Sequence, residues 1–499
     1  MRALISIILF LPLAAFSQFE TAAYFSANMI LQRDQPIPVW GRAIPGRKVE
    51  VRFGTHTKQT VARTDSSWLL YLPPQPASYE PGTLQISSGD TAVLFPNILT
   101  GDIWLCLGQS NMEWPMNLEM HFKEAVKKNQ ARGLRIYNPV YAGKNIYATV
   151  FPDSVSMLLT SNRFYQGAWQ TCDSQTLSSM SAVAYYFGHT ISTNMHIPVG
   201  LINLAIGGAP LETFIDQQTL LTNKQFNAKV NGDWLKNNSL PVWIRERGMQ
   251  NIGNINTVAA DAYGKNHGFK PGFAYAAGIQ SLRPMPIKGI LLYQGESNAQ
   301  ETERVMEYGA LTALMVSDFR KKWKNPALPF YFVQLSSIDS IRYKSQLWPL
   351  FRDEQRKLLQ RIPNSGMAVC SDLGSENDVH PRNKKEVGER LARLALYSTY
   401  RQKIIPSGPL PQKAIYKNGK ITIRFSNSGN ALLTADGRPV RGFSVDGKND
   451  CPAFIEKNQI TIPVETRPLY VYYGWQPFTT ANLINTENLP ASTFKINVQ

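Results

Sequence analysis

Between about residues 97 and 400 the sequence alternates short apolar runs with longer stretches of helical pattern. Each apolar run has the length of a buried strand, whereas the stretches between them carry apolar residues at helical spacing. This alternation is typical of βαβ units and predicts a mainly parallel sheet covered by helices. Strands are expected at 103–107, 199–206, 289–293, 330–335 and 367–371, and helices at 178–193, 274–282, 302–323 and 384–400.

Shorter β-type runs, broken by Pro and Gly, flank this region on both sides. A chain of 499 residues is too long for a single core. We therefore expect an N-terminal β domain at 18–98, a central α/β domain at 99–400 and a C-terminal β domain at 401–499. Residues 221–271 are polar and rich in Asn and Gly, which indicates an insertion over the sheet.

The first 17 residues carry one Arg and then an apolar run that ends in Ala15, Phe16 and Ser17. This pattern fits a secretory signal peptide cleaved before Gln18. No Cys follows the apolar run, and no later apolar stretch reaches the roughly 18 residues of a membrane span. The sequence predicts an exported protein, periplasmic or secreted, without a membrane anchor.

The formal net charge is +16, but the Lys and Arg residues are scattered and no nucleic-acid-binding motif accompanies them. Nucleic acid is therefore not the expected partner, while an acidic sugar is compatible with the charge. The four cysteines are widely spaced and form no C-x-x-C pair, so no metal site is expected. Nothing in the sequence indicates the oligomeric state.

Four predicted strands end in clusters of small and polar residues. Ligands bind at the carboxyl ends of parallel strands, so these clusters are expected to meet. In the first cluster Ser110 follows a sharp turn at Gly108, although an isolated serine there could also be a helix N-cap. The four clusters are Gly108 to Asn111, Gly207 to Glu212, Gln294 to Asn298 and Ser371 to Lys384.

Two of these clusters contain the groups that acyl transfer needs. The backbone N–H groups of Gly207 and Gly208 could stabilise an oxyanion, or the glycines could form only a tight turn. In the last cluster, His380 can act as a base for a serine hydroxyl if an acceptor holds its second nitrogen. Asp378 is the nearest acceptor in the sequence, and Glu296 and Asp372 are rivals.

Taken together, the four blocks resemble those of the SGNH/GDSL hydrolase superfamily, and specifically the sialate O-acetylesterases. The blocks read, in order, GQSNMEWPM, NLAIGGAPLE, YQGESNA and NDVHPRNK. The resemblance covers roughly residues 99–400. It implies a flavodoxin-like three-layer α/β/α hydrolase core with flanking β-sandwich-like segments. It also implies removal of O-acetyl groups from a sugar without metal or other cofactor, with Ser110 as nucleophile and His380 as base.

The chain departs from the superfamily pattern at two positions. The superfamily places its acid three residues before the histidine, where this chain has Asn377, with Asp378 one residue later. Its third block reads glycine-x-asparagine-aspartate, whereas here Gly295 is followed by Glu296, Ser297 and Asn298. The acid is therefore Asp378 or its rival Glu296, unless His380 works with Ser110 as a near-dyad.

The mechanism that the resemblance implies passes through an acetyl-serine intermediate. The oxyanion donors would be the N–H groups of Ser110 and of Gly208 or Gly207, together with a side-chain amide from Gln294 or Asn298. Trp114, Glu113 and the 221–271 insertion are expected to line the sugar subsite.

Three alternatives stay open. The same chemistry serves acetylated xylan or another polysaccharide as well as sialic acid. A glycoside hydrolase would instead use two carboxylates, with Glu212 and Glu296 as acid and base. A secreted sugar-binding protein without turnover would not need Ser110 at all.

Overall fold

The computed structural model describes residues 19–127 and 132–499 of the chain. The protein is of the α/β class and is built around a large mixed sheet, which confirms the class predicted from the alternating pattern. The main path of the sheet runs in the order β12-β9-β13-β8-β16-β17-β18. The strands are β8 (Thr91–Gly108), β9 (Leu134–Tyr137), β12 (Trp169–Thr171), β13 (Val199–Asn203), β16 (Gly289–Tyr293), β17 (Phe330–Gln334) and β18 (Ser365–Val369).

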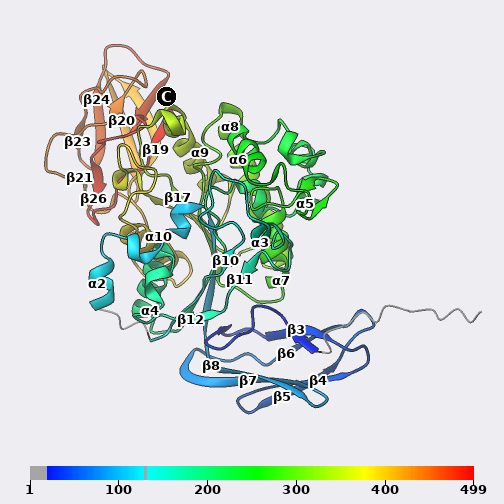
Figure 1. Ribbon diagram of the computed structural model, residues 1–499. Coiled ribbons are helices and arrows are strands. Elements are labelled where there is room, and N and C mark those ends of the chain that lie inside the picture. Colours follow the sequence, from blue (N-terminus) through cyan, green and yellow to red (C-terminus); the bar gives the residue numbers. More distant parts are fainter. Residues whose placement is uncertain (1–18, 128–131) are drawn as a thin grey trace, which may run out of the picture.

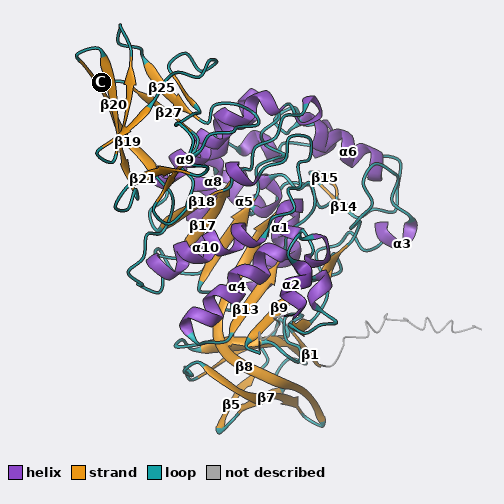
Figure 2. Cartoon of the chain, turned by 90° about the vertical axis from the view of Figure 1, so that its left-hand side faces the viewer, coloured by secondary structure: helices purple, strands orange, loops and turns teal. Residues whose placement is uncertain are grey.

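The strands from β9 to β18 pair in parallel, and only β12 at the edge of this path is antiparallel. Strand β8 lies between β13 and β16, so these three strands end side by side at one edge of the sheet. All residues of β13, β16 and β17 are buried, because helices cover the sheet (Figure 2). Burial on both faces explains why these strands read as continuous apolar runs.

The helices lie on both sides of the sheet (Figure 1). On one side α4 and α10 pack against each other and against β13 and β18, and on the other side α8 packs against α9. The α-helices are α1 (Ser110–Glu113), α2 (Phe122–Lys127), α3 (Asp153–Ser156), α4 (Ala182–Met195), α5 (Gln217–Thr222), α6 (Val242–Ile252), α7 (Gln280–Leu282), α8 (Thr302–Lys322), α9 (Trp348–Arg361) and α10 (Lys385–Ser398). The helices predicted at 178–193, 302–323 and 384–400 correspond to α4, α8 and α10. In the one predicted at 274–282, a π-helical turn, Tyr275–Ile279, precedes α7.

The N-terminal strands join the central sheet through β8. The first half of β8 pairs antiparallel with β7, and its second half pairs parallel with β13 and β16. The border expected between residues 98 and 99 therefore falls within one continuous strand. The other N-terminal strands are β1 (Phe19–Thr21), β2 (Ile30–Gln32), β3 (Ile37–Ala43), β4 (Lys48–Phe53), β5 (His56–Val61), β6 (Ser67–Leu72) and β7 (Ser78–Ser88).

The C-terminal strands form small antiparallel sheets at the opposite end of the molecule from the N-terminal strands (Figure 1). They enclose a hydrophobic cluster of their own, with members from Ala414 to Val498. The strands are β19 (Leu410–Lys417), β20 (Lys420–Ser426), β21 (Leu432–Thr434), β22 (Phe443–Ser444), β23 (Phe454–Glu456), β24 (Gln459–Pro463), β25 (Tyr470–Tyr473), β26 (Leu483–Asn485) and β27 (Phe494–Asn497). The remaining short strands are β10 (Val140–Tyr141), β11 (Tyr165–Gln166), β14 (Ala260–Asp261) and β15 (Gly264–Lys265).

A buried arginine fastens the C-terminal strands to the central layer. Arg352 of α9 is fully buried, and its guanidinium donates hydrogen bonds to the carbonyl oxygens of Gly474 at 3.1 Å, Pro477 at 3.4 Å and Gln476. Burial lowers the pKa of Arg352 to about 9. A buried cation with several carbonyl acceptors is a costly arrangement unless every bond is kept.

Replacing Arg352 by methionine is expected to lower the free energy of unfolding by about 2 to 3 kcal/mol, because buried carbonyl groups lose their donor. Urea denaturation followed by circular dichroism measures this loss. Arg361→Met, at the exposed end of the same helix, is the matched control and should change stability by less than about 0.5 kcal/mol. Equal stability of the two variants would contradict a fastening role for Arg352.

Candidate active site

Ser110 lies at the carboxyl end of β8, where the strand turns into the short helix α1. Gly108 has φ 143°, and a Cβ atom there would come within 2.0 Å of the Tyr293 carbonyl oxygen on β16. Only glycine lets the two strands end this close together. Because Ser110 is the first residue of α1, its N–H group has no partner within the helix and stays available to a ligand.

The histidine predicted as base meets this serine directly. His380 Nε2 lies 2.8 Å from Ser110 Oγ, although the two residues are 270 positions apart in the chain. His380 belongs to the loop between the 3₁₀ turn Ser371–Leu373 and α10. Strands β8 and β18 end at the same edge of the sheet, which brings the two segments together. A hydrogen bond of this length permits proton transfer from the hydroxyl to the imidazole.

The imidazole of His380 is held by an aromatic ring. It stacks on Trp114, with ring centres 5.2 Å apart and planes inclined by 21°. The structure places Trp114, which the sequence predicted to line the sugar subsite, directly beside the contact between Ser110 and His380. Burial, and after it the charge of Lys384, lowers the pKa of His380 to about 4, so the ring is neutral at pH 7.

Asp378 is close to His380 but is not a tight partner of its second nitrogen. Asp378 Oδ1 accepts a hydrogen bond from the backbone N–H of His380 at 2.9 Å. Its distance to His380 Nδ1 is 3.8 Å, and 56% of the Asp378 side chain is exposed. Asp378 therefore orients the loop, while its electrostatic attraction to the His380 imidazole is weakened by the distance and by exposure to solvent.

The two rival acids form other contacts in the structure. Asp372 makes a two-point ion pair with Arg390, with both oxygens at 2.7 Å. The carboxylate of Glu296 accepts a hydrogen bond from Asn111, and burial raises the pKa of Glu296 to about 7. Among the described residues, neither carboxylate contacts His380.

The two predicted glycines differ in their N–H groups. The Gly207 N–H donates to the Tyr141 hydroxyl at 3.0 Å. Gly208 has φ 77°, and within the described chain its N–H donates to no protein acceptor. Of the two, Gly208 is thus the one whose N–H is free for an oxyanion.

The two predicted side-chain donors are engaged with neighbours. The Nε2 group of Gln294 donates to Asn298 Oδ1 at 2.7 Å. It also lies 3.3 Å from both Gln109 Oε1 and the Ala209 carbonyl. Asn298 is fully buried, accepts from the Leu211 N–H at 3.1 Å and donates to Glu212 at 3.0 Å. In this arrangement both amide side chains are hydrogen-bonded to neighbouring residues and stabilise the ends of the strands.

Gln109 is a site residue that sequence reasoning missed. It is buried, and its Oε1 accepts from the N–H groups of Gly295 and Ser297 at 3.4 and 3.3 Å. The side chain beside the nucleophile thereby ties the end of β8 to the end of β16. The one feature of the sequence that could have identified Gln109 is its place in the first polar cluster, directly before Ser110.

Glu212 is committed to a structural ion pair. It is fully buried, its Oε1 lies 2.8 Å from Lys229 Nζ, and its Oε2 accepts from Asn298. Burial opposes ionisation, but Lys229 and Asn298 lower the pKa of Glu212 below its usual value. A carboxylate held in this way cannot easily donate or accept a proton. The arrangement therefore disfavours Glu212 and Glu296 as the pair of a glycoside hydrolase.

Residues of the segment 221–271, which the sequence predicted to be an insertion, line a small cavity together with Gly207. A small cavity of about 30 Å³ adjoins Gly207 and is lined by the segment around Tyr141 and by Arg247 and His267 of the insertion. Glu113 lies at the same place, because it accepts from the Tyr141 hydroxyl at 3.1 Å and pairs with Lys144 at 3.1 Å.

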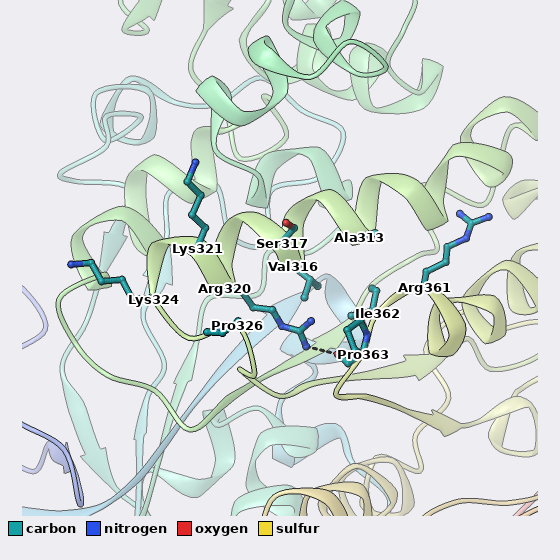
Figure 3. A pocket seen from close by; sticks show the side chains of 10 residues that line it. All are labelled: Ala313, Val316, Ser317, Arg320, Lys321, Lys324, Pro326, Arg361, Ile362 and Pro363. Carbon is teal, nitrogen blue, oxygen red and sulfur yellow. Dashed lines mark hydrogen bonds between the residues drawn. The ribbon is translucent and has the colours of Figure 1, made fainter.

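A larger cavity, of about 670 Å³, lies between the C-terminal half of α8 and the turn after α9 (Figure 3). Its walls precede β17 and β18, so it opens at the amino ends of these strands, away from Ser110. None of the predicted site residues lines it. Its lining comprises Ala313, Val316, Ser317, Arg320, Lys321, Lys324, Pro326, Arg361, Ile362 and Pro363.

Residues 19–127 and 132–499 contain no group of three or more His, Cys, Asp or Glu side chains placed to hold a metal ion. No helix in this part of the chain has both the length and the apolar character needed to cross a membrane. Cys106 and Cys370 are buried thiols and form no disulfide.

Comparisons with known proteins point to one family. The family model described as carbohydrate esterase, sialic acid-specific acetylesterase, matches residues 264–397, a range that includes His380. The sialate O-acetylesterase of Homo sapiens is 26% identical over 429 residues, which are 79% of this chain and 74% of that protein. The Rattus norvegicus sialate O-acetylesterase is 25% identical over 452 residues, 79% of this chain and 76% of its own length.

Among solved structures, a novel carbohydrate acetylesterase from Xanthomonas citri is similar over almost the whole chain. Its TM-score is 0.78 at 27% sequence identity, and the match covers 96% of this chain and 99% of that one. The resemblance to the sialate O-acetylesterases that the sequence motifs indicated is confirmed.

Proposed function

This chain is a carboxylic ester hydrolase related to the sialate O-acetylesterases, and we propose that it removes O-acetyl groups from sialic acid through an acetyl-serine intermediate. The observation that carries the proposal is the 2.8 Å contact between Ser110 Oγ and His380 Nε2 at the carboxyl edge of the sheet. A hydroxyl paired with a neutral imidazole is the arrangement that activates a serine for attack on an ester.

The proposed fold detail is a flavodoxin-like SGNH core of three layers between two β domains. Leaving out β9 and β12, the parallel strands run β13-β8-β16-β17-β18, which is the order 2-1-3-4-5 of flavodoxin-like sheets. The division into domains at 18–98, 99–400 and 401–499 belongs to the same proposal. The separate hydrophobic cluster of the C-terminal strands supports the last border.

In the first half-reaction, Ser110 attacks the acetyl carbonyl carbon while His380 Nε2 takes the hydroxyl proton. The carbonyl oxygen becomes an oxyanion, for which the N–H groups of Ser110 and Gly208 are the available donors. The sugar oxygen leaves with the proton from His380. Water then attacks the acetyl-serine and gives a proton to His380 Nε2; the bond between the acetyl carbon and Ser110 Oγ breaks, Ser110 Oγ takes this proton from His380, and acetate is released.

In this mechanism His380 is oriented chiefly by stacking on Trp114, with Asp378 as a weak electrostatic partner. The pair is thus closer to a dyad than to a triad. The rival acid Glu296 faces Asn111 and has no direct part in the proton transfer.

Arg247 favours a sugar that carries a carboxylate. It lines the small cavity beside Gly207, and its Nε donates to Gln250 Oε1 at 3.1 Å. Within the described chain it forms no ion pair with an acidic side chain. Burial, and after it the positive charge of Arg342, lowers the pKa of Arg247, so a second cation lies near it. Sialic acid has the carboxylate that would pair with it, and xylan does not.

Arg247→Ala is therefore expected to raise KM for O-acetylated sialic acid by about tenfold or more, because a charge-assisted hydrogen bond is lost. Its kinetics on acetylated xylan should change by less than about twofold. Lys236→Ala, at an exposed cation of the same insertion, is the control and should alter neither substrate. An equal effect of Arg247→Ala on both substrates would contradict carboxylate recognition.

The proposed substrate is tested by comparing acetate release from O-acetylated sialic acid and from acetylated xylan with the wild-type enzyme. Faster release from sialic acid is expected. If xylan is the faster substrate, the polysaccharide alternative replaces the proposal, while the esterase chemistry stands.

We also propose that the protein is exported and acts in the periplasm or outside the cell. The support is the pattern of the first 17 residues, which lie outside the described residues. Mass spectrometry of the exported protein should find Gln18 at its N-terminus.

A further inference from the structure

A single amide side chain joins the segment of the nucleophile to the segment of the base. Asn111 directly follows Ser110 and is 1% exposed. Its Nδ2 donates to the Val379 carbonyl at 3.0 Å, and Val379 directly precedes His380. The two halves of the catalytic pair are therefore hydrogen-bonded to each other one residue away from the reacting atoms.

Two buried charged groups hold this amide in place. Lys384 Nζ donates to Asn111 Oδ1, and Asn111 Nδ2 donates to Glu296 Oε1 as well as to the Val379 carbonyl. Lys384 is fully buried and Glu296 is 3% exposed. An amide has one accepting end and one donating end. The lysine donor therefore turns the Nδ2 end of Asn111 toward the histidine segment.

The ammonium group of Lys384 also lies close to the aromatic ring on which the His380 imidazole stacks. Its Nζ is 5.5 Å from the centre of the Trp114 ring and 5.6 Å from that of Tyr293. The Trp114 indole is the same ring that stacks on His380. Cation–π attraction of this kind stabilises the ring that carries the base.

The charged and titratable groups around His380 come from three segments. Ser110 contacts it from α1, Asp378 and Lys384 belong to its own loop, and Tyr343 faces Asp378 from the 3₁₀ turn Ile341–Tyr343. Lys384 is the cation among them. After burial, its charge is the second cause that lowers the pKa of His380 to about 4, and Asp378 opposes it.

Lys384 is in turn surrounded by groups that offset its burial. Burial lowers its pKa to about 7, whereas Glu296 is the strongest of the neighbours that raise it; the others are Cys370, Asp378 and Glu119. The Asn111 bridge thus connects a buried cation and a buried carboxyl group, neither of which contacts the reacting atoms.

We propose that Lys384 is a positioning residue: through Asn111 it holds the histidine segment against the serine segment, and it places a buried positive charge close to the Trp114 ring on which the His380 imidazole stacks. The inference rests on the serine–histidine chemistry proposed above. It predicts that mutation can tell the two effects apart. Removing the Asn111 amide abolishes only the hydrogen-bonded bridge, whereas removing Lys384 abolishes both the bridge and the positive charge.

The test is the pH profile of kcat/KM for hydrolysis of phenyl acetate, a small ester without a sugar, followed by acetate release. In the wild type, activity should rise with pH through a limb near the pKa of His380, about 4, and reach a plateau below the pKa of Lys384, about 7. Lys384→Met should lower the plateau by about 10²-fold, because the pair loses its alignment. It should also move the acid limb up by about one pH unit, because a positive charge that opposed protonation is gone.

Two further variants separate the two effects. Asn111→Ala should lower the plateau without moving the acid limb upward, because the bridge is lost and the cation stays. Lys385→Met, at the next residue, removes the same charge from a partly exposed side chain and should change neither quantity.

The proposal would be overturned if Lys384→Met kept the plateau value of kcat/KM of the wild type. It would also be overturned if the plateau fell but the acid limb of the pH profile did not move. If Lys384→Met does not fold, a wild-type plateau in Asn111→Ala would overturn it equally. Failure of the proposed chemistry is distinguishable, because Ser110→Ala would then hydrolyse phenyl acetate as fast as the wild type. Failure of the proposed sugar would leave the phenyl acetate results as predicted.

Discussion

Ser110→Ala is expected to lower acetate release from O-acetylated sialic acid by about 10⁴-fold or more. The reason is that the hydroxyl is the atom that forms the covalent intermediate, and no other nucleophile contacts His380 Nε2 among the described residues. Acetate release under saturating substrate measures the loss. The fold should be unaffected, since among the described residues the Ser110 hydroxyl bonds to His380 alone, and the side chain is not part of the core.

Ser317→Ala is the matched control for this variant, since Ser317 is an exposed serine on α8 that lines the larger cavity, away from Ser110. It should keep wild-type activity. Activity of Ser110→Ala within tenfold of the wild type would show that the reaction does not pass through this serine.

His380→Ala is expected to cost about 10⁴-fold in kcat, because the hydroxyl proton then has no acceptor. Asp378→Asn should cost about fivefold or less. Its carboxylate is 56% exposed and 3.8 Å from His380 Nδ1, and an ion pair so exposed contributes little. Steady-state kinetics of the two variants in parallel measure the contrast, which distinguishes a near-dyad from a triad.

Comparable losses in His380→Ala and Asp378→Asn would contradict the near-dyad. They would mean that Asp378 moves onto His380 Nδ1 when substrate binds. Glu296→Gln adds the remaining comparison, because a direct acid at that position would lose as much activity as His380→Ala.

The arrangement of the central strands and the meeting of Ser110 with His380 could be predicted from the sequence. Fully buried parallel strands read as continuous apolar runs, as Gly289–Tyr293 does, and the polar clusters after them must lie at one edge. The site can therefore be predicted from the order of strands and polar clusters along the chain, because the topology brings the ends of β8 and β18 to the same edge of the sheet.

Helix α9, which was not predicted, shows where the apolar pattern fails. Its sequence, WPLFRDEQRKLLQR, buries charged residues such as Arg352, Asp353 and Glu354 beside apolar ones. Arg352 and Asp353 bond to the C-terminal region; for example, Asp353 Oδ1 accepts a hydrogen bond from the Lys495 N–H of β27 at 3.2 Å. A burial pattern made by partners far along the chain cannot be read from local periodicity.

The same limit applies to the support of the active site. Asn111 and Lys384 are 273 residues apart, and their hydrogen bond depends on the loop geometry at both strand ends. Sequence patterns identify which polar residues follow a strand, but not which of them will be buried together. Strand β9 was missed for a simpler reason, since Leu134–Tyr137 is too short to stand out.

The most direct test of the proposed mechanism is to trap the covalent intermediate. The enzyme is mixed with O-acetylated sialic acid, quenched in acid during turnover, digested and analysed by mass spectrometry. The proposed mechanism predicts one acetyl group on the peptide that contains Ser110, and none on that peptide from His380→Ala or Ser110→Ala. Release of acetate with no acetylated peptide at any quench time, or an acetyl group on a different residue, would contradict the proposed mechanism.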